Sequence, residues 1–129
     1  MILVKTHLDT SKIPDAGIGL FADEFISKGT LVWKFVPGFD FALKKGDLNK
    51  LPKIAKSFVL HYGYYNEDEG GYVICVDNSR FMNHSKNPNT TDTNIIGTMT
   101  IKDIHKGEEI TCNYFEFDAG AKLKLANKK

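Results

Sequence analysis

Three segments of the chain carry side chains that could take part in chemistry. Residues 17–19 (GIG) suit either a tight turn or the close approach of backbone to a ligand. Residues 80–89 (RFMNHSKNPN) gather amide, imidazole and hydroxyl groups, which either cap turns in an irregular loop or form a polar ligand pocket. Residues 107–114 (GEEITCNY) form a turn that leads into a strand. Its last residue, Tyr114, is either a half-buried strand aromatic or a catalytic phenol.

Patterns typical of several other reaction sites are absent. The sequence has no Cys-x-x-Cys and no His-x-x-x-His pair, so the spacing indicates no zinc site, and no metal ligands are predicted. It also has no Gly-x-x-x-x-Gly-Lys phosphate loop and no strand followed by a dinucleotide-binding glycine fingerprint and a long helix. The two cysteines, Cys75 and Cys112, allow at most one disulfide.

Taken together and in order, the three segments resemble the SET domain of protein-lysine methyltransferases. They read AGIGLF at 16–21, RFMNHSKNPN at 80–89 and GEEITCNY at 107–114. The turn ISKG at 26–29 agrees with the same family. The string RFxNHSxxPN together with GEExxxxY is highly specific, and the resemblance extends over about residues 15–118. The chain resembles the compact stand-alone type, without a cysteine-rich region before the domain or a zinc-binding segment after it.

The resemblance implies a mainly β SET-domain fold (β-clip), with several small curved sheets, a C-terminal pseudoknot and a short helical insertion. It also implies S-adenosyl-L-methionine as methyl donor and S-adenosyl-L-homocysteine as product. The side chain of Asn83 would contact the amino group of the donor, and His84 would contact its adenine through the backbone. The backbone near Gly17 would meet its methionine end. The residues carried over as cofactor-binding are Ala16, Gly17, Ile18, Asn83, His84 and Tyr114.

The implied activity is methyl transfer to the side-chain amine of a lysine in a protein or peptide, a histone or another basic protein. A free lysine has a pKa of about 10.4, and burial beside a positive sulfonium lowers it. The amine can therefore lose its proton to water without a strong protein base. Alignment then does most of the catalytic work, and the hydroxyl of Tyr114, the catalytic residue, would fix the line of attack.

The stem of the substrate lysine requires an apolar channel with aromatic walls. Core or surface packing is the alternative role for every aromatic candidate. Cys112 stands where many histone-directed members carry an aromatic residue that influences how many methyl groups are added, so the number added is left open. The candidate channel residues are Tyr62, Tyr64, Phe115, Phe117 and Cys112, with Tyr65 as a further aromatic.

Charged segments of the chain bear on its possible partners. The acidic run at 67–69 either attracts a basic peptide or is a solvated loop. Lysines near the end of the chain, such as Lys124, are interpreted as a solubilising tail, although the tail at 115–129 must also close the substrate channel or leave it open. A homodimer that supplies wall residues is left open. The alternative function is a catalytically silent SET module that binds a peptide or a partner protein.

The chain has the length and composition of one domain. It contains 129 residues with a formal net charge of +1, so no global basic field favours direct nucleic-acid binding. No apolar run is long enough to span a bilayer, and the N-terminal residues lack the apolar stretch of a secretory signal. We therefore expect an intracellular protein, cytoplasmic or nuclear, that has no membrane partner. A single domain over 1–129 is expected, with a basic tail at 119–129.

The elements that must position these residues are mostly short strands. Apolar residues three and four apart predict one helix over 47–61, and Pro52 indicates that its regular part starts one turn after Asp47. Gly17 and Gly19 predict a turn, and residues 78–94 should be mostly irregular. The predicted strands cover 1–8, 30–36, 72–76, 95–104 and 109–114, and a helical turn is expected within 119–129.

Overall fold

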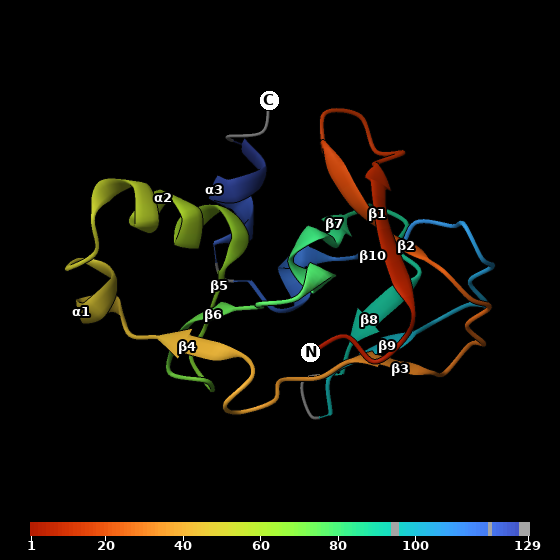
Figure 1. The fold of residues 1–129 in the computed structure, drawn as a ribbon, viewed down its shortest axis with the longest axis horizontal. Helices are drawn as coiled ribbons and strands as arrows, with labels where there is room; N and C mark the ends of the chain where they lie inside the picture. Colours follow the sequence, from red (N-terminus) through yellow and green to blue (C-terminus); the bar gives the residue numbers. More distant parts are fainter. Residues whose placement is uncertain (94–95, 119, 127–129) are drawn as a thin grey trace.

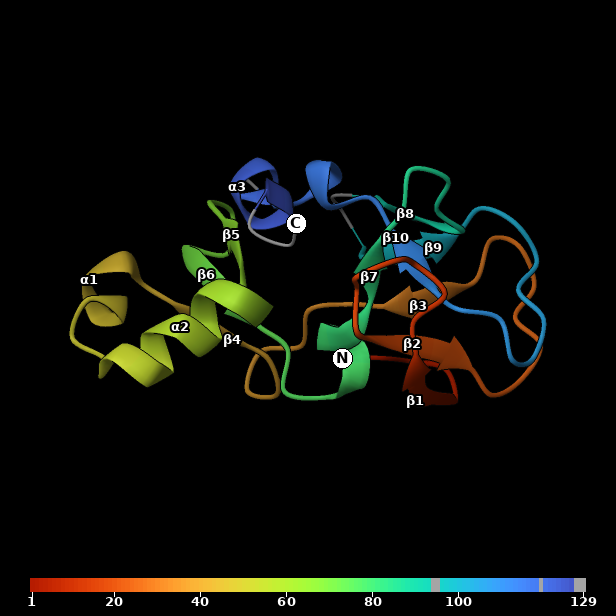
Figure 2. The same ribbon diagram turned by 90° about the horizontal axis from the view of Figure 1, so that it is seen from above.

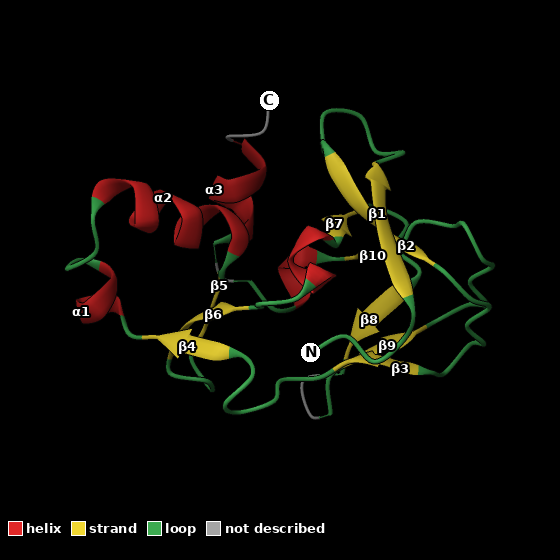
Figure 3. Cartoon of the chain, viewed as in Figure 1, coloured by secondary structure: helices red, strands yellow, loops and turns green. Residues whose placement is uncertain are grey.

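The computed structural model describes residues 1–93, 96–118 and 120–126. Figure 1 shows an elongated molecule, with the helices toward one end and most of the strands toward the other. The view from above separates the same two ends, and colouring by secondary structure shows how little helix lies on the strand side (Figures 2 and 3). The mainly β fold predicted from the resemblance is confirmed.

The strand side is built from two small sheets. Strand β1 (Thr6–Thr10) pairs antiparallel with β2 (Ile18–Ala22). Strand β9 (Thr98–Thr100) lies between β3 (Leu31–Trp33) and β8 (Thr90–Asp92), antiparallel to both. These elements surround a core of apolar side chains that are almost completely buried. The side chains face inward from β2, from β3, from the segment between these strands, and from the last motif and the residues before it. Its buried members are Leu20, Ala22, Ile26, Val32, Ile104 and Ile110.

The helical side contains the predicted insertion. Helix α1 (Lys45–Leu48) is one short turn, and α2 (Lys53–Tyr62) begins directly after Pro52, whose ring suits a helix start but not a helix interior. These helices lie beside a third sheet of three antiparallel strands, ordered β4-β6-β5. The bounds of its strands are Phe41–Leu43 for β4, Tyr64–Asn66 for β5 and Gly71–Ile74 for β6.

Two very short strands cross the middle of the molecule. Strand β7 (Asn83–His84) and strand β10 (Thr111–Cys112) run parallel, with Asn83 opposite Thr111. A tight turn, η1 (Asn78–Phe81), precedes β7, and another, η2 (Tyr114–Glu116), follows β10. The second and third motifs therefore lie side by side. The chain ends in the short helix α3 (Ala121–Ala126).

The side chain of Asn89 substitutes for a strand partner beside β10. Its amide nitrogen donates to the carbonyl oxygen of Glu109 at 2.8 Å, and its amide oxygen accepts from the N–H of Thr111 at 2.8 Å. The hydroxyl of Thr90 donates to the carbonyl oxygen of Thr111 at 2.7 Å. Backbone groups that would otherwise lack partners are thus satisfied by the polar loop of the second motif.

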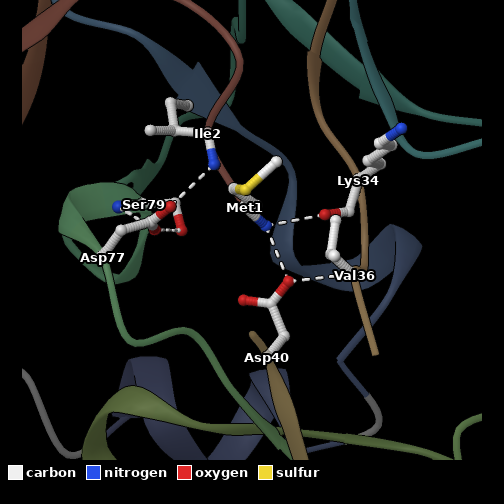
Figure 4. Close-up of polar contacts among 7 residues, drawn as sticks. All are labelled: Met1, Ile2, Lys34, Val36, Asp40, Asp77 and Ser79. Carbon is white, nitrogen blue, oxygen red and sulfur yellow. Dashed lines mark hydrogen bonds and ion pairs between the residues drawn. The ribbon is translucent and has the colours of Figure 1, made fainter. Parts of the chain in front are cut away.

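A polar clasp joins the N-terminal residues to the segment before β4 (Figure 4). The α-amino group of Met1 donates to the carbonyl oxygen of Lys34 at 2.6 Å and to Asp40 Oδ2 at 2.7 Å. The N–H of Val36 donates to the same carboxylate oxygen at 2.9 Å. The Asp40 side chain has no exposed surface, so these donors compensate a fully buried charge.

A second carboxylate, Asp77, extends this clasp toward η1 (Figure 4). Its Oδ2 accepts from the N–H of Ile2 at 2.7 Å, and its Oδ1 accepts from the N–H of Ser79 at 3.0 Å and from the Ser79 hydroxyl. Burial opposes ionisation of Asp77, but the hydrogen bonds from Ser79 and Ile2 outweigh it and lower the pKa of the carboxyl below its usual value. Asp77 therefore caps η1 and ties it to the N-terminal segment.

Several predicted elements differ from the observed ones. Gly19 does not form part of a turn but lies in β2, where a Cβ would come within 2.9 Å of the Glu109 side chain. The predicted strand over 95–104 is reduced to β9, and the strand over 109–114 to β10, because Tyr114 already begins the η2 turn. Strands β4 and β5 were not predicted, and β8 lies in the segment expected to be irregular.

Candidate active site

The three predicted motifs meet around β7. The Asn83 amide nitrogen donates to the carbonyl oxygen of Ile18 at 2.9 Å, which links the second motif to the first. Asn83 is 5% exposed and pairs with Thr111 in the parallel ladder, which links it to the third motif. The backbone at Ile110 completes the arrangement, because its N–H donates to the carbonyl oxygen of Leu20 at 2.7 Å. Side chains that are far apart in the sequence are therefore held together by a small set of hydrogen bonds.

The loop before β2 is anchored by a buried carboxylate. Glu109 accepts hydrogen bonds from the hydroxyl of Ser11 at 2.8 and 2.9 Å and from the N–H of Lys12 at 2.6 Å. Gly17 has a φ of 76°, a left-handed conformation that favours glycine, and a Cβ built there meets nothing within 4 Å. The backbone at Gly17 is thus open to the approach of a ligand.

Tyr114 is oriented by contacts at both ends. Its N–H donates to His84 Nδ1 at 3.1 Å, and its hydroxyl donates to the carbonyl oxygen of Met82 at 3.1 Å. Because His84 Nδ1 accepts this bond, the proton of the neutral ring lies on Nε2. Burial, with a smaller effect from Cys112 and Asp118, raises the pKa of the Tyr114 phenol. The hydroxyl therefore stays protonated at neutral pH and acts as a hydrogen-bond donor rather than as a base.

A cavity of about 430 Å³ lies beside Tyr114. Part of its wall is a series of rings in edge contact, with centroid distances of 6.5 Å for Trp33 and Tyr64 and 5.0 Å for Tyr64 and Phe117. Phe117 continues the series to Tyr114 at 6.0 Å. The cavity is also lined by Tyr62, Met82, Cys112, Asp118 and Lys124.

Most of the channel candidates lie on this cavity. Tyr62, Tyr64, Phe117 and Cys112 line it together with Tyr114. Burial, with nearby Cys75 and Asp92, raises the pKa of Tyr64, so its phenol stays neutral as well. The distribution fits an aromatic channel of the kind expected for a long aliphatic stem.

Phe115 and Tyr65 lie elsewhere. The η2 turn directs Tyr114 and Phe117 inward, while the Phe115 side chain remains 60% exposed. Phe115 packs at 5.6 Å, centroid to centroid, against the His84 ring and lines a shallower groove shared with Tyr65. Ala16, Gly17, Ile18, Asn83 and His84 also do not line the 430 Å³ cavity, and Ile18 and Asn83 are joined by their own hydrogen bond.

Sequence reasoning missed other cavity residues. Trp33 belongs to no motif that the sequence singles out, and Met82 lies in the second motif but was given no role. Lys124 was interpreted as part of a solubilising tail. Lys124 instead donates to Asp118 at 2.8 Å from a side chain that is only 14% exposed. No local pattern reveals this position, because exposed and buried lysines look alike in a short basic segment.

The cavity wall combines aromatic rings with buried polar side chains. Within residues 1–93, 96–118 and 120–126, no three His, Cys, Asp or Glu side chains are grouped to hold a metal ion. Cys75 and Cys112 are both buried, and burial raises the pKa of the Cys75 thiol to about 11. The buried side-chain nitrogens Trp33 Nε1 and Arg80 Nε lack hydrogen-bond partners and belong to residues that line the cavity. Unsatisfied donors in a wall that combines aromatic and charged side chains fit a ligand with both polar and apolar parts.

No helix in the described part of the chain has both the length and the apolar character needed to cross a membrane. A comparison with curated proteins gives no match.

Solved structures are similar over nearly the whole chain. A structure of apo Polycomb Repressive Complex 2 of Chaetomium thermophilum, with a mutated Ezh2, shares 28% identity and a TM-score of 0.68 over 94% of this chain and 16% of that chain. The autoinhibited complex bound to S-adenosylmethionine shares 26% identity and a TM-score of 0.64 over 98% of this chain and 17% of that chain. This chain thus spans about a sixth of the length of these relatives.

A third structure is of similar size. It is a Plasmodium falciparum protein assigned as a histone methyltransferase, with 19% identity and a TM-score of 0.59 over 88% of this chain and 95% of that chain, and it supports the fold alone. A family model of the SET domain matches residues 17–115, which include the second and third motifs, the first motif except Ala16, and most of the chain. With the motifs joined around β7 and the family model covering them, this chain belongs to the SET domain family.

Proposed function

We propose that this protein transfers a methyl group from S-adenosyl-L-methionine to the side-chain amine of a lysine in a protein or peptide. The observation that carries the proposal is the environment of Tyr114. Its hydroxyl is held by Met82, its backbone by His84, and it faces a cavity with aromatic walls. The SET neighbour bound to S-adenosylmethionine supports the same donor for this chain.

The donor would bind where the first two motifs meet. The backbone of residues 16–18 is open to a ligand at Gly17, and the side chain of Asn83 would hold the amino group of the donor. The backbone of His84 would meet the adenine, while its ring orients Tyr114. The donor supplies an electrophilic methyl on a positive sulfonium, and the residues of this chain bind and align it.

The acceptor amine would enter through the channel beside Tyr114. Tyr64 and Phe117 would pack against the lysine stem, and Cys112 would leave space near the amine. A buried, neutral phenol at Tyr114 can position the amine but cannot take its proton. The proton therefore leaves to water before attack, which is favoured because an apolar site disfavours the charged amine. Alignment of the two reactants can contribute roughly 7–11 kcal/mol to lowering the barrier.

The substrate is proposed to be a basic protein, a histone among others. Asp68 and Glu69 lie in the acidic loop and line the cavity, where they would attract a positively charged peptide. The same proposal includes the C-terminal pseudoknot of the SET fold. It is supported by the parallel pairing of β7 with β10 and by the hydrogen bonds from the Asn89 side chain to residues 109 and 111. Homodimer formation and an intracellular location remain predictions.

The test begins with calorimetric titration of the purified protein with S-adenosyl-L-methionine. We expect saturable binding that weakens in Asn83→Ala, because that variant removes the amide between the first two motifs. Asn87→Ala is the matched control, since Asn87 lies in the same loop and its exposed side chain accepts a hydrogen bond from Lys102.

Transfer is then measured with a labelled methyl donor and lysine-containing basic peptides. Tyr114→Phe should keep donor binding and lose most of its turnover, because only the aligning hydroxyl is removed. A folded wild-type protein that binds donor but labels no lysine, with any peptide or protein extract, would favour the catalytically silent module instead.

A further inference from the structure

The ammonium group of Lys124 lies inside the molecule, although this lysine belongs to the basic tail. It donates to Asp118 Oδ2 at 2.8 Å and to the carbonyl oxygen of Gly63 at 2.6 Å. The side chains of Lys124 and Asp118 are 14% and 3% exposed. Nζ also lies 5.6 Å from the centroid of the Tyr114 ring, within the range of a cation–π contact. A tail lysine normally keeps this group in water, so its burial requires a compensating arrangement.

Both partners of Lys124 are neighbours of channel aromatics in the sequence. Gly63 directly precedes Tyr64, and Asp118 directly follows Phe117. The rings of Tyr64 and Phe117 pack edge to face at 5.0 Å between centroids. One ammonium thus joins the two chain segments that carry opposite members of this ring pair.

The same contact reaches Tyr114 through the backbone. The N–H of Asp118 donates to the carbonyl oxygen of Tyr114 at 2.8 Å, so Asp118 closes the η2 turn, which begins at Tyr114 and is followed directly by Phe117. Asp118 Oδ1 also accepts from the N–H of Gly120 at 2.9 Å. Asp118 is therefore held on both oxygens, and movement of Lys124 is transmitted to the turn rather than absorbed by a loose side chain.

We propose that Lys124 is a positioning residue that sets the width of the channel between Tyr64 and Phe117, and thereby its fit to the acceptor amine. The inference rests on the proposed function, because that function assigns the channel to a lysine. Without the ammonium, the Gly63 carbonyl and the Asp118 carboxylate lose a shared donor, and the two segments can separate. A wider channel binds an unmodified lysine less closely and leaves more space for an amine that already carries a methyl group.

The first measurement does not depend on activity. The chain contains one tryptophan, Trp33, and its ring lies 6.5 Å from that of Tyr64 on the cavity wall. Acrylamide quenching of Trp33 fluorescence should therefore increase in Lys124→Met, which keeps the apolar stem and removes the donors. Lys122→Met is the matched control, since Lys122 is exposed on the same helix, and its quenching should equal that of the wild type.

The second measurement is steady-state methylation of a lysine peptide. Displacement of a channel wall by about 1 Å can reduce rates by up to about 100-fold. In Lys124→Met we expect KM for the peptide to rise about tenfold, with a smaller change in kcat. The fraction of product that carries more than one methyl group should rise. Lys124→Arg retains the charge and the donors and should restore part of the wild-type KM.

A second variant separates a loss of folding from a change in channel width. Lys124→Met alone leaves the Asp118 charge buried without its partner, which is strongly destabilising. The double variant Lys124→Met with Asp118→Asn removes that charge and keeps an acceptor for Gly120. Its melting curve establishes folding before quenching and KM are compared.

Two outcomes would count against the proposal in different ways. A folded double variant with wild-type quenching, KM and product distribution overturns the clamp while leaving the methyltransferase proposal intact. A wild-type protein that binds no methyl donor overturns the proposed function, and with it the assignment of this channel to a lysine acceptor.

Discussion

The strand side and the helical side of the molecule differ in how their apolar side chains are packed. On the strand side, Leu20, Ile104 and Ile110 have no exposed surface and form one continuous apolar core. On the helical side, Ile54 is 87% exposed and Phe41 is 57% exposed. Figure 1 shows the crossing of β7 and β10 between these two sides.

Besides buried apolar residues such as Val59 and Val73, the helical side is held by partly buried polar contacts with residues near both ends of the chain. Asp40 receives the Met1 amino group near β4, and Lys124 reaches the Gly63 carbonyl at the start of β5. Apolar burial is non-directional, whereas charge-assisted hydrogen bonds fix geometry. The difference suggests that changes on the strand side alter mainly stability, and changes on the helical side alter the shape of the cavity.

The largest effect should come from the apolar core. Ile110→Ala removes a completely buried side chain and should lower the free energy of unfolding by about 2–5 kcal/mol. Ile54→Ala removes the same atoms from an exposed helix position and should stay within about 0.5 kcal/mol of the wild type. Urea unfolding measures both. Equal losses of unfolding free energy in the two variants would contradict the contrast between the strand side and the helical side.

The next effect should come from the clasp at Asp40. Asp40→Asn keeps the shape of the side chain but removes the buried charge that the Met1 amino group and the Val36 N–H contact, and should cost about 1–3 kcal/mol. Asp47→Asn is the control, because the Asp47–Lys50 pair is exposed and such pairs contribute roughly 0–1 kcal/mol. Thermal unfolding by calorimetry compares them. If Asp40→Asn has the same melting temperature as the wild type, the clasp has no role in stability.

A polar contact on the strand side should matter less. Thr90→Val keeps the side-chain shape and removes the hydroxyl that donates to the carbonyl oxygen of Thr111, at an expected cost of about 0.5–1.5 kcal/mol. Amide hydrogen exchange should show faster exchange near β10 in this variant. A loss larger than that of Ile110→Ala would mean that polar contacts dominate both sides.

The smallest effect concerns pH. Asp77 has a lowered pKa in the folded state, so it binds fewer protons there than in the unfolded chain at moderately acidic pH. Its contribution to stability is therefore complete above its ordinary value of 3.8 and is lost as pH falls through the lower folded-state pKa. The unfolding free energy of Asp77→Asn should depend less steeply on pH below about 4. An unchanged slope would exclude Asp77 as a source of acid sensitivity.

Much of the fold could be predicted because the signals are local. The apolar spacing around Pro52 predicted a helix close to α2, and the predicted strand over 72–76 overlaps β6, whereas β2 was not predicted. Strands β4 and β5 were missed because each has only three residues and depends on pairing with β6. Gly19 was misjudged because its small size serves close packing against Glu109 rather than a turn.

The order and composition of three motifs were enough to identify the SET family and to single out Asn83, His84 and Tyr114, since such motifs are written in consecutive residues. Only the tertiary structure showed that Phe115 faces outward while Phe117 faces the cavity, because a single tight turn at η2 decides their directions. It alone placed Lys124 against Gly63, 61 positions earlier in the chain. Which distant groups share a buried charge depends on how the chain closes on itself, and no local pattern of residues encodes that closure.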